Sequence, residues 1–577
     1  MDPNLPSFNT LKKKSKIVID AKPIKVAILS DSASQLIHQA IKGFGVSEEV
    51  NYEIFEADYN QIDRQIFDPS SELYEFAPDY VLILRGTEKL AKQFYKLDKT
   101  EQSNFYESQV SYLDSLYQAL NSRLNCKIII NDFIELNDGV FGNFAAKIKT
   151  SLLYQLKKLN IALIEYAQDR KNIFILNLSG LVTKFGYFNS FDSKMYFNAD
   201  MIYSIEFLPL LAKNISDIIQ AAQGIFKKCI ILDLDNTTWG GIIGDDGMEG
   251  IQIGDLGMGK IFSELQLWVK QLKKRGIIVA VCSKNTESIA KEPFISHKDM
   301  VLRLEDISVF IANWENKADN IRHIQSILNI GMDSIVFVDD NPFERELVKK
   351  EISAITVPDL PEDPAEYLIY LKSLNLFETI SFTEEDELRT LQYQEEAKRN
   401  VLLKSFANEE EFLANLEMTS EVGEFDGFTI PRVAQLSQRS NQFNLRTIRY
   451  TEEDLKEIIK NADFRTLSFT LKDKFGENGL IAFVVLKKID ESTIFIENWA
   501  MSCRVLKRGM ESFTLNCIVE DAIKNGYTKL AGEYIPTKKN MMVEDHYEKL
   551  GFKADSQTRF SLDLNDYKPF KTYINKL

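Results

Sequence analysis

The residues best suited to chemistry lie in the middle of the chain, each at or shortly after the end of a short apolar run. They are Asp233, Asp235, Thr237, Cys282, Ser283, Lys284, Lys317, Asp339 and Asp340. If these runs are strands of one parallel sheet, their carboxyl ends meet at the edge where such sheets bind ligands. The sequence therefore predicts that acidic, hydroxyl and basic side chains from distant parts of the chain gather in one site.

This set of side chains suits phosphoryl transfer. A carboxylate such as Asp233 can attack phosphorus and form an aspartyl-phosphate, which divides one difficult step into two easier ones. Asp235, two positions later, can act as the general acid and base. Thr237 and Ser283 offer hydroxyl donors to phosphate oxygens, and Lys284 adds a positive charge next to Ser283. We expect these three residues to bind the substrate phosphate.

The same edge of the predicted sheet offers a magnesium site. Mg²⁺ prefers hard oxygen ligands in octahedral geometry, with substrate phosphate completing the shell. The predicted ligands are Asp233, the backbone carbonyl of Asp235, and the pair Asp339 and Asp340. Lys317 supplies a fixed positive charge that can stabilise the transition state. The expected cofactor is therefore Mg²⁺.

Apolar runs rich in β-branched residues alternate with helix-like stretches through the N-terminal and central parts of the chain. The predicted strands are 25–30, 50–56, 79–84, 126–131 and 173–178, then 229–235, 277–283, 308–314, 334–340 and 354–359. Helix-like stretches such as 143–169 and 260–275 lie between strands. This alternation is typical of parallel α/β sheets.

The pattern changes toward the C-terminus. Residues 376–425 are rich in Glu and Lys and suggest a helical connection. Three consecutive strand-like runs and a helix follow, at 466–472, 480–487, 493–500 and 508–524, which predicts an antiparallel meander. We expect an α/β, multidomain protein with domains at 1–224, 225–375 and 426–577 around that connection.

Bulk properties exclude several classes of protein. At 577 residues the chain is too long for one core. The net charge of −16 argues against a general nucleic-acid binder, which needs a basic face. The chain has no apolar run near the ~20 residues of a membrane span, and its start has no apolar signal segment. The five scattered cysteines show no zinc spacing, so we expect a cytoplasmic protein.

The order of the central motifs resembles the haloacid dehalogenase (HAD) superfamily: DLDNT, a Ser after a hydrophobic strand, a Lys, and an acidic pair. The longer strings ILDLDNTTWGGIIGDDG, VCSKN, NWENKADNI and VFVDDNPFERE resemble its FkbH-like subfamily, subclass IIIC. With NQFNLRTIRY and WAMSCRVLKRGME, the resemblance covers most of residues 220–577. It implies a Rossmann-like catalytic domain with Asp233 as nucleophile.

The FkbH-like resemblance also implies a reaction. Members of this type are implicated in dephosphorylating 1,3-bisphosphoglycerate and loading its glyceryl group onto an acyl carrier protein. Cys282 in VCSKN stands where a thioester-forming thiol of the family would be; the alternative is a buried, inert cysteine. A simple phosphomonoester phosphatase with the flanking domains as binding modules is the second reading, and a non-enzymatic scaffold is the third. The expected partners are a phosphorylated small molecule and an acyl carrier protein.

The N-terminal domain resembles the SGNH hydrolases through ILSDSAS, where Ser32 would be the nucleophile. Asn131 ends a later strand, as the Asn of that family does. The family's D-x-x-H motif appears as Asp200-Met-Ile-Tyr203, and a tyrosine cannot serve as a base at neutral pH. His38 does not match the motif. We therefore expect a binding domain without esterase activity.

The C-terminal segment resembles the GNAT acyltransferase fold, which binds the pyrophosphate of CoA or pantetheine at a helix N-terminus. The residues that this resemblance assigns to pantetheine are Arg504, Arg508, Gly509 and Asn540. Lys507 replaces the first glycine of the family's pattern. Recognition of a pantetheine arm is the favoured role, and acetyl transfer is the alternative.

Overall fold

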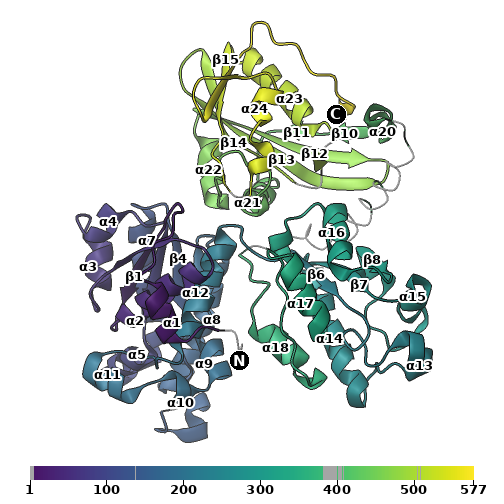
Figure 1. Cartoon of the computed structure of the whole chain (residues 1–577). Coiled ribbons are helices and arrows are strands. Elements are labelled where there is room, and N and C mark those ends of the chain that lie inside the picture. The colour runs from purple at the N-terminus through teal and green to yellow at the C-terminus, as the bar shows by residue number, and fades with distance from the viewer. Residues whose placement is uncertain are drawn as a thin grey trace. The chain divides into compact units, whose positions relative to one another are not determined.

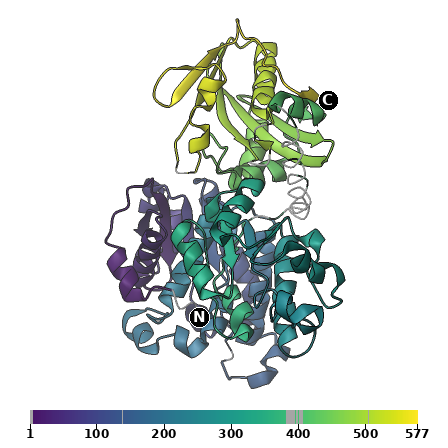
Figure 2. The same ribbon diagram turned by 45° about the vertical axis from the view of Figure 1, so that its right-hand side comes forward.

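The computed structural model describes residues 5–577 apart from 137, 381, 383–394, 396–398, 400–405, 407, 503, 504, 507 and 538. The chain divides into two compact units, 1–221 and 222–577, and the second unit contains two separate sheets (Figures 1 and 2). Mixed α/β architecture and several domains were predicted, and both are confirmed. Among the described residues, no helix combines the length and the hydropathy that crossing a membrane requires.

The N-terminal unit is built on a five-stranded parallel sheet in the order β2-β1-β3-β4-β5. Its strands are β1 (Ile24–Ser30), β2 (Tyr52–Glu56), β3 (Tyr80–Leu84), β4 (Lys127–Asn131) and β5 (Ile173–Leu176). Its longer helices are α2 (Gln35–Ser47), α5 (Thr87–Phe94), α7 (Phe105–Asn121), α8 (Leu152–Gln168) and α12 (Leu208–Ala222). The middle strand β3 is buried at every residue, as expected of a strand covered on both faces.

The central sheet has four parallel strands in the order β8-β7-β6-β9. They are β6 (Cys229–Leu232), β7 (Ile278–Ser283), β8 (Val309–Ala312) and β9 (Ile335–Val338). The helices are α13 (Ile243–Gly250), α14 (Gly257–Lys274), α15 (Glu287–Ser296), α16 (Lys317–Leu328), α17 (Pro342–Glu351) and α18 (Tyr367–Ser373). Because β6 lies between β7 and β9, the residues after these three strands meet at one edge.

The fifth predicted central strand, 354–359, does not join this sheet as a strand. It contributes one isolated bridge, between Val336 and Thr356. Pro358 has no backbone N–H to donate to a ladder, and this accounts for the early end of the pairing.

Side chains of β7 alternate between two separate cores. Val279 and Val281 face the core that includes α14. Ala280 and Cys282 face the opposite core, which includes α16. This alternation decides which strand-end side chains can reach the site.

The C-terminal sheet is mixed, in the order β16-β17-β15-β14-β13-β12-β10-β18 with β11 paired to β12. The meander predicted here consists of β12 (Phe464–Asp473), β13 (Gly476–Lys488) and β14 (Thr493–Met501). Other elements are α20 (Glu409–Asn415), β10 (Met418–Ser420), β11 (Val422–Gly423), α21 (Ile430–Arg439), α22 (Glu452–Lys460), α23 (Met510–Lys524), β15 (Lys529–Glu533), α24 (His546–Lys549), β16 (Lys553–Ala554), β17 (Arg559–Asp563) and β18 (Ile574–Lys576).

The stretch predicted as a helical connection, 376–425, contains part of this C-terminal sheet. Its strands β10 and β11 both pair with β12. The two strands are only three and two residues long, too short for a period of two to stand out among Glu and Lys residues.

Candidate active site

The centre of the site is a buried lysine held between two carboxylates. Lys317, the first residue of α16, lies 2.6 Å from Asp339 Oδ2 and 3.0 Å from Asp233 Oδ1. Burial alone would lower the pKa of Lys317, but the two carboxylates outweigh it and raise the pKa above its ordinary value. Burial and the neighbouring Asp233 carboxylate raise the pKa of Asp339. Three elements distant in sequence therefore meet at this cluster, as the motif spacing predicts.

Asp340 completes the acidic side of the site. Its backbone N–H donates to Thr237 Oγ1 at 2.9 Å, and the Thr237 hydroxyl lies 3.1 Å from Asp340 Oδ1. Thr237 is fully buried. The sequence assigned Thr237 to substrate phosphate, but its hydroxyl is already engaged twice with Asp340. Thr237 therefore positions Asp340, and its contact with substrate phosphate stays a prediction.

Asp235 has a different environment from Asp233. Its Oδ1 accepts hydrogen bonds from Trp239 Nε1 and from the backbone N–H of Ile243, each at 3.0 Å, and its Oδ2 accepts from Asn285 Nδ2 at 3.2 Å. Burial raises the pKa of this carboxyl above its ordinary value. A fixed carboxyl group that holds its proton more readily suits the general acid that the sequence assigned to Asp235.

Ser283 and Lys284 stand at the end of β7. Ser283 is buried, and it lies on the strand next to β6. Lys284 Nζ forms an ion pair with Glu344 Oε1 at 2.6 Å. Lys284 is partly exposed, so it remains able to meet a phosphate, with Glu344 fixing where its ammonium lies. Contact of either residue with phosphate stays a prediction.

Cys282 does not belong to the site. Its side chain is fully buried in the apolar core that includes α16, and its sulfur lies 3.8 Å from the backbone oxygen of Lys317. Burial raises the pKa of the thiol to about 12. The described geometry does not present this thiol as a nucleophile, and a thioester-forming role for Cys282 stays a prediction. Its neighbour Ser283 lies on the opposite face of the strand, as alternation requires.

The carboxylates fit a divalent metal ion. Asp233, Asp339 and Asp340 each offer an oxygen, and these atoms lie within 4.8 Å of one another. Such a set of hard, negatively charged oxygens is the kind that Mg²⁺ prefers. The fourth predicted ligand is the backbone carbonyl of Asp235. Its side chain is not part of this group, because Trp239 and Ile243 hold it.

Two residues that the sequence reasoning missed support the acidic pair. Arg345, buried on α17, donates to the backbone oxygens of Asp339 at 2.9 Å and Asp340 at 2.6 Å. Glu344, also buried, holds Lys284. Both lie in VFVDDNPFERE, directly after the acidic pair. An arginine five or six residues after an acidic pair is a sequence signal for a side chain that supports the turn of that pair.

The residues assigned to pantetheine are mostly engaged within the C-terminal domain. Asn540 is fully buried; its Oδ1 accepts from the backbone of Thr537 at 2.7 Å, and its Nδ2 donates to the backbone oxygen of Asn444 at 3.1 Å. Arg508 is buried and lies 3.2 Å from Asp473. These two side chains therefore hold the domain together. Contact of either side chain with pantetheine stays a prediction.

The other two residues assigned to pantetheine are Gly509 and Arg504. Gly509 precedes α23 with a φ of 75°, and a Cβ added there would meet nothing within 4 Å. Because glycine has no side chain, the backbone at the start of α23 is not covered at this position. Arg504 lies outside the described residues.

Among the residues that the structure describes, none is hydrogen-bonded to the SGNH-like Ser32 as a histidine base would be. Ser32 is buried, with its hydroxyl 3.3 Å from the Ser30 hydroxyl. Burial raises the pKa of Tyr203 well above its ordinary value. His38 Nδ1 lies 2.9 Å from Glu56 Oε2, so it pairs with Glu56. The Asn131 amide is used by the backbone of Arg85. A binding role for this domain stays a prediction.

Comparison with known proteins identifies the N-terminal and central parts of the chain. A family model for the N-terminal domain of FkbH matches residues 25–220. The chain is also similar to a crystal structure of the N-terminal part of the protein BF1531 from Bacteroides fragilis, which contains a phosphatase domain and is complexed with Mg. The sequence identity is 49%, the TM-score is 0.63, and the match covers 66% of this chain and 100% of that one.

The C-terminal part is similar to solved acetyltransferases, but only distantly. The Escherichia coli ribosomal-protein-S18-alanine N-acetyltransferase is 15% identical over 26% of this chain and 97% of its own, with a TM-score of 0.20. The GNAT domain of PAT from S. lividans is 16% identical over 25% of this chain and 89% of its own, also with a TM-score of 0.20. No activity follows from values this low. A search of curated proteins found no match.

Proposed function

Because this chain belongs to the FkbH-like family and contains a HAD phosphatase domain, we propose that it is a Mg²⁺-dependent phosphatase with Asp233 as its nucleophile. The observation that carries the proposal is the contact of Lys317 with Asp233 and Asp339. It joins a nucleophile, a fixed positive charge and a metal-binding carboxylate in one cluster.

The chemistry divides into two half-reactions. In the first, an Asp233 oxygen attacks phosphorus, the bond from phosphorus to the leaving oxygen breaks, and the Asp235 carboxyl gives its proton to that oxygen. In the second, Asp235 accepts a proton from a water molecule. The resulting hydroxide attacks the aspartyl-phosphate and releases inorganic phosphate. Lys317 keeps Asp233 in place and balances the charge that develops on the phosphoryl oxygens.

Magnesium fits the site on the chemistry of its donors. Asp233, Asp339 and Asp340 would hold the ion, which when bound supplies positive charge to the phosphate oxygens. The complex of the similar Bacteroides fragilis protein with Mg supports this choice of metal. Arg345 and Thr237 would keep the ligands in place through their contacts with Asp339 and Asp340.

Phosphate release by the full chain tests this function. We expect turnover of acetyl phosphate or p-nitrophenyl phosphate that requires Mg²⁺, is abolished by EDTA, and falls by several orders of magnitude in Asp233→Asn, since an amide is not a nucleophile here. Glu315→Gln, an exposed carboxylate on the loop before α16, is the matched control. Near-wild-type release by Asp233→Asn in EDTA would rule the mechanism out.

We further propose, from the FkbH-like resemblance of the central motifs, that the phosphorylated substrate is an acyl phosphate such as 1,3-bisphosphoglycerate and that its acyl group passes to an acyl carrier protein. With Cys282 buried, the pantetheine thiolate of the carrier would itself attack the carbonyl carbon. The bond from that carbon to the phosphate oxygen would break, a thioester would form, and phosphate would leave. Mass spectrometry of the carrier after incubation distinguishes this transfer, which leaves an acyl adduct, from phosphatase action, which leaves the free acid.

A further inference from the structure

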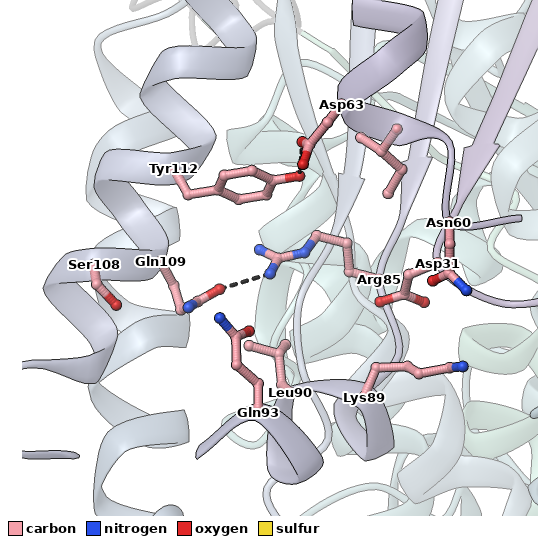
Figure 3. Close-up of a pocket in the computed structure, with 11 residues that line it drawn as sticks. Asp31, Asn60, Asp63, Arg85, Lys89, Leu90, Gln93, Ser108, Gln109 and Tyr112 are labelled. Atoms are coloured by element: carbon pink, nitrogen blue, oxygen red, sulfur yellow. Dashed lines mark hydrogen bonds between the residues drawn. The ribbon is translucent and has the colours of Figure 1, made fainter. Parts of the chain in front are cut away.

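A polar cavity lies in the N-terminal unit, at the carboxyl ends of β1 and β3. Its volume is about 440 Å³, in the range of small-molecule sites. The walls come from the turns after the two strands, from the segment that follows β2 and begins α3 (Ile62–Phe67), and from α5 and α7. Figure 3 shows Arg85 pointing toward Gln109 of α7. Ser32 does not line the cavity. Its neighbour Asp31 does, so the cavity opens beside the hydrolase-like serine without including it.

Arg85, the residue after β3, is the cation of this cavity. Its Nη2 donates to Gln109 Oε1 at 2.6 Å, and its guanidinium lies 4.8 Å from the centre of the Tyr112 ring. Within the described part of the chain, no carboxylate oxygen comes within 4.0 Å of it. Burial lowers the pKa of Arg85 below its ordinary value. A desolvated guanidinium with unused donors calls for an anionic ligand, and its planar shape suits a carboxylate.

The opposite walls offer groups that suit hydroxyls. The side-chain amides of Asn60 and Gln93 line the cavity and have no hydrogen-bond partner among the residues described. The Asp31 carboxylate accepts from the backbone N–H of Gly86 at 3.0 and 3.1 Å, and it retains capacity for more hydrogen bonds. Amides and carboxylates together can bind the donors and acceptors of several hydroxyl groups.

The carboxylates limit the charge of the ligand. Burial raises the pKa of Asp31 to about 6, so it is mostly ionised at neutral pH. Asp63 also lines the cavity and accepts from Tyr112 Oη at 2.6 Å. The second cation, Lys89, is already paired with Asp200 at 2.5 Å. The two carboxylates offset the charge of Arg85, so the cavity disfavours a phosphate dianion and is compatible with at most one negative charge, placed directly on the guanidinium.

We propose that this cavity binds a small polyhydroxylated carboxylate, with the carboxylate on Arg85 and the hydroxyls on Asp31, Asn60 and Gln93. The N-terminal unit is then a small-molecule-binding domain in a chain whose phosphatase site lies on another sheet. The cavity size fits a hydroxy acid or a monosaccharide acid. Neutral polyols lack the group that Arg85 recognises.

Isothermal titration of the full chain with glycerate, gluconate and glucuronate tests the proposal, with glycerol and glucose as the neutral counterparts. At least one of the acids should bind, and at least tenfold more tightly than its neutral counterpart. Arg85→Gln should weaken that binding at least tenfold, the loss expected for a charge-assisted pair. The matched control is Arg123→Gln: Arg123 lies outside the cavity and donates to the backbone oxygens of Ile66 and Phe67 at 3.1 and 3.2 Å.

Three results would overturn the proposal: equal binding of acids and neutral polyols, unchanged binding by Arg85→Gln, or no heat from any of the acids at millimolar concentration. If Arg85→Gln fails to fold, Arg85→Lys replaces it in the test. This variant keeps the positive charge but lacks the planar guanidinium, so weakened binding of the acid supports the proposal. Asp233→Asn and EDTA should leave the binding of the acid to this cavity unchanged. The binding result therefore does not depend on whether the phosphatase mechanism is correct.

Discussion

Lys317 neutralises two carboxylates that would otherwise repel each other in a buried site. Lys317→Met should lower phosphate release by several orders of magnitude. It should also destabilise the protein by about 3 kcal/mol, because two buried charges lose their partner. Activity and thermal unfolding measured together check both effects, with Lys298→Met, at an exposed residue, as the control. Wild-type turnover in Lys317→Met would contradict the role given to this ammonium.

The buried position of Cys282 predicts that its thiol is not needed for phosphate release. Cys282→Ala should retain phosphate release within about threefold, and its stability should fall by about 1 kcal/mol, as for a small truncation in a core. Intact-mass analysis after incubation with 1,3-bisphosphoglycerate should show no hydroxylamine-labile adduct on this residue in the wild type. An acyl adduct on Cys282 would mean that the thiol leaves the core during turnover.

Residue types showed which chemistry to expect, but they did not show where each side chain points. Asp233, Lys317 and Asp339 meet as their strand-end positions predict. Cys282 and Thr237 have suitable types and stand at suitable positions, yet one faces the core and the other is bound to Asp340. Which face of β7 meets the site depends on packing against α14 and α16, and a single sequence does not contain that information.

At the scale of the element, the start of α17 fixes the acidic pair. Arg345 binds the backbone oxygens of Asp339 and Asp340, so Arg345→Met should loosen the turn that carries two metal ligands. We expect the Mg²⁺ concentration for half-maximal activity to rise about tenfold, as on loss of other groups that orient ligands. Arg322→Met, on the exposed side of α16, is the control, and an unchanged Mg²⁺ dependence in Arg345→Met would refute the positioning role.

Helix α24 carries an element-scale prediction about pH. His546 is buried between Phe443 and Trp499, with ring centres at 4.8 and 4.7 Å. Burial lowers its pKa to about 3 from an ordinary value of 6.5. Between these values the unfolded chain binds a proton that the folded chain does not. The stability from neutral His546 is therefore fully present above pH 6.5 and is lost as the pH falls toward 3.

His546→Phe should flatten the pH dependence of one thermal transition of the full chain on the acidic side of about pH 6.5. Calorimetry across that range measures it. His323→Phe, at an exposed position on α16, should leave the pH dependence as in the wild type. A transition that keeps its full acid sensitivity in His546→Phe would show that other groups set it.

The longer and more apolar strands were the ones that the sequence predicted correctly. The strands of both parallel sheets and the three-stranded meander lie where apolar runs placed them. The strands that were not predicted are β10, β11 and β15 to β18, which are two to five residues long. β10 and β11 pair with β12, distant in sequence, and local periodicity does not report such a contact.

At the scale of the whole molecule, the N-terminal unit should act without hydrolysis. Ser32 is buried beside Ser30, and His38 is paired with Glu56. The full chain should therefore show no activity on p-nitrophenyl acetate above that of Ser32→Ala. A rate that Ser32→Ala abolishes would reveal a base that the described geometry does not provide.

The most direct test of the account is whether the phosphoryl group passes through Asp233. The full chain is mixed with Mg²⁺ and acetyl phosphate and quenched in acid within the first turnovers, and its peptides are examined by mass spectrometry. We predict one added phosphoryl group on the peptide that contains Asp233, sensitive to hydroxylamine, longer-lived in Asp235→Asn and absent from Asp233→Asn. Steady phosphate release with no adduct on that peptide, or an adduct that persists in Asp233→Asn, would contradict it.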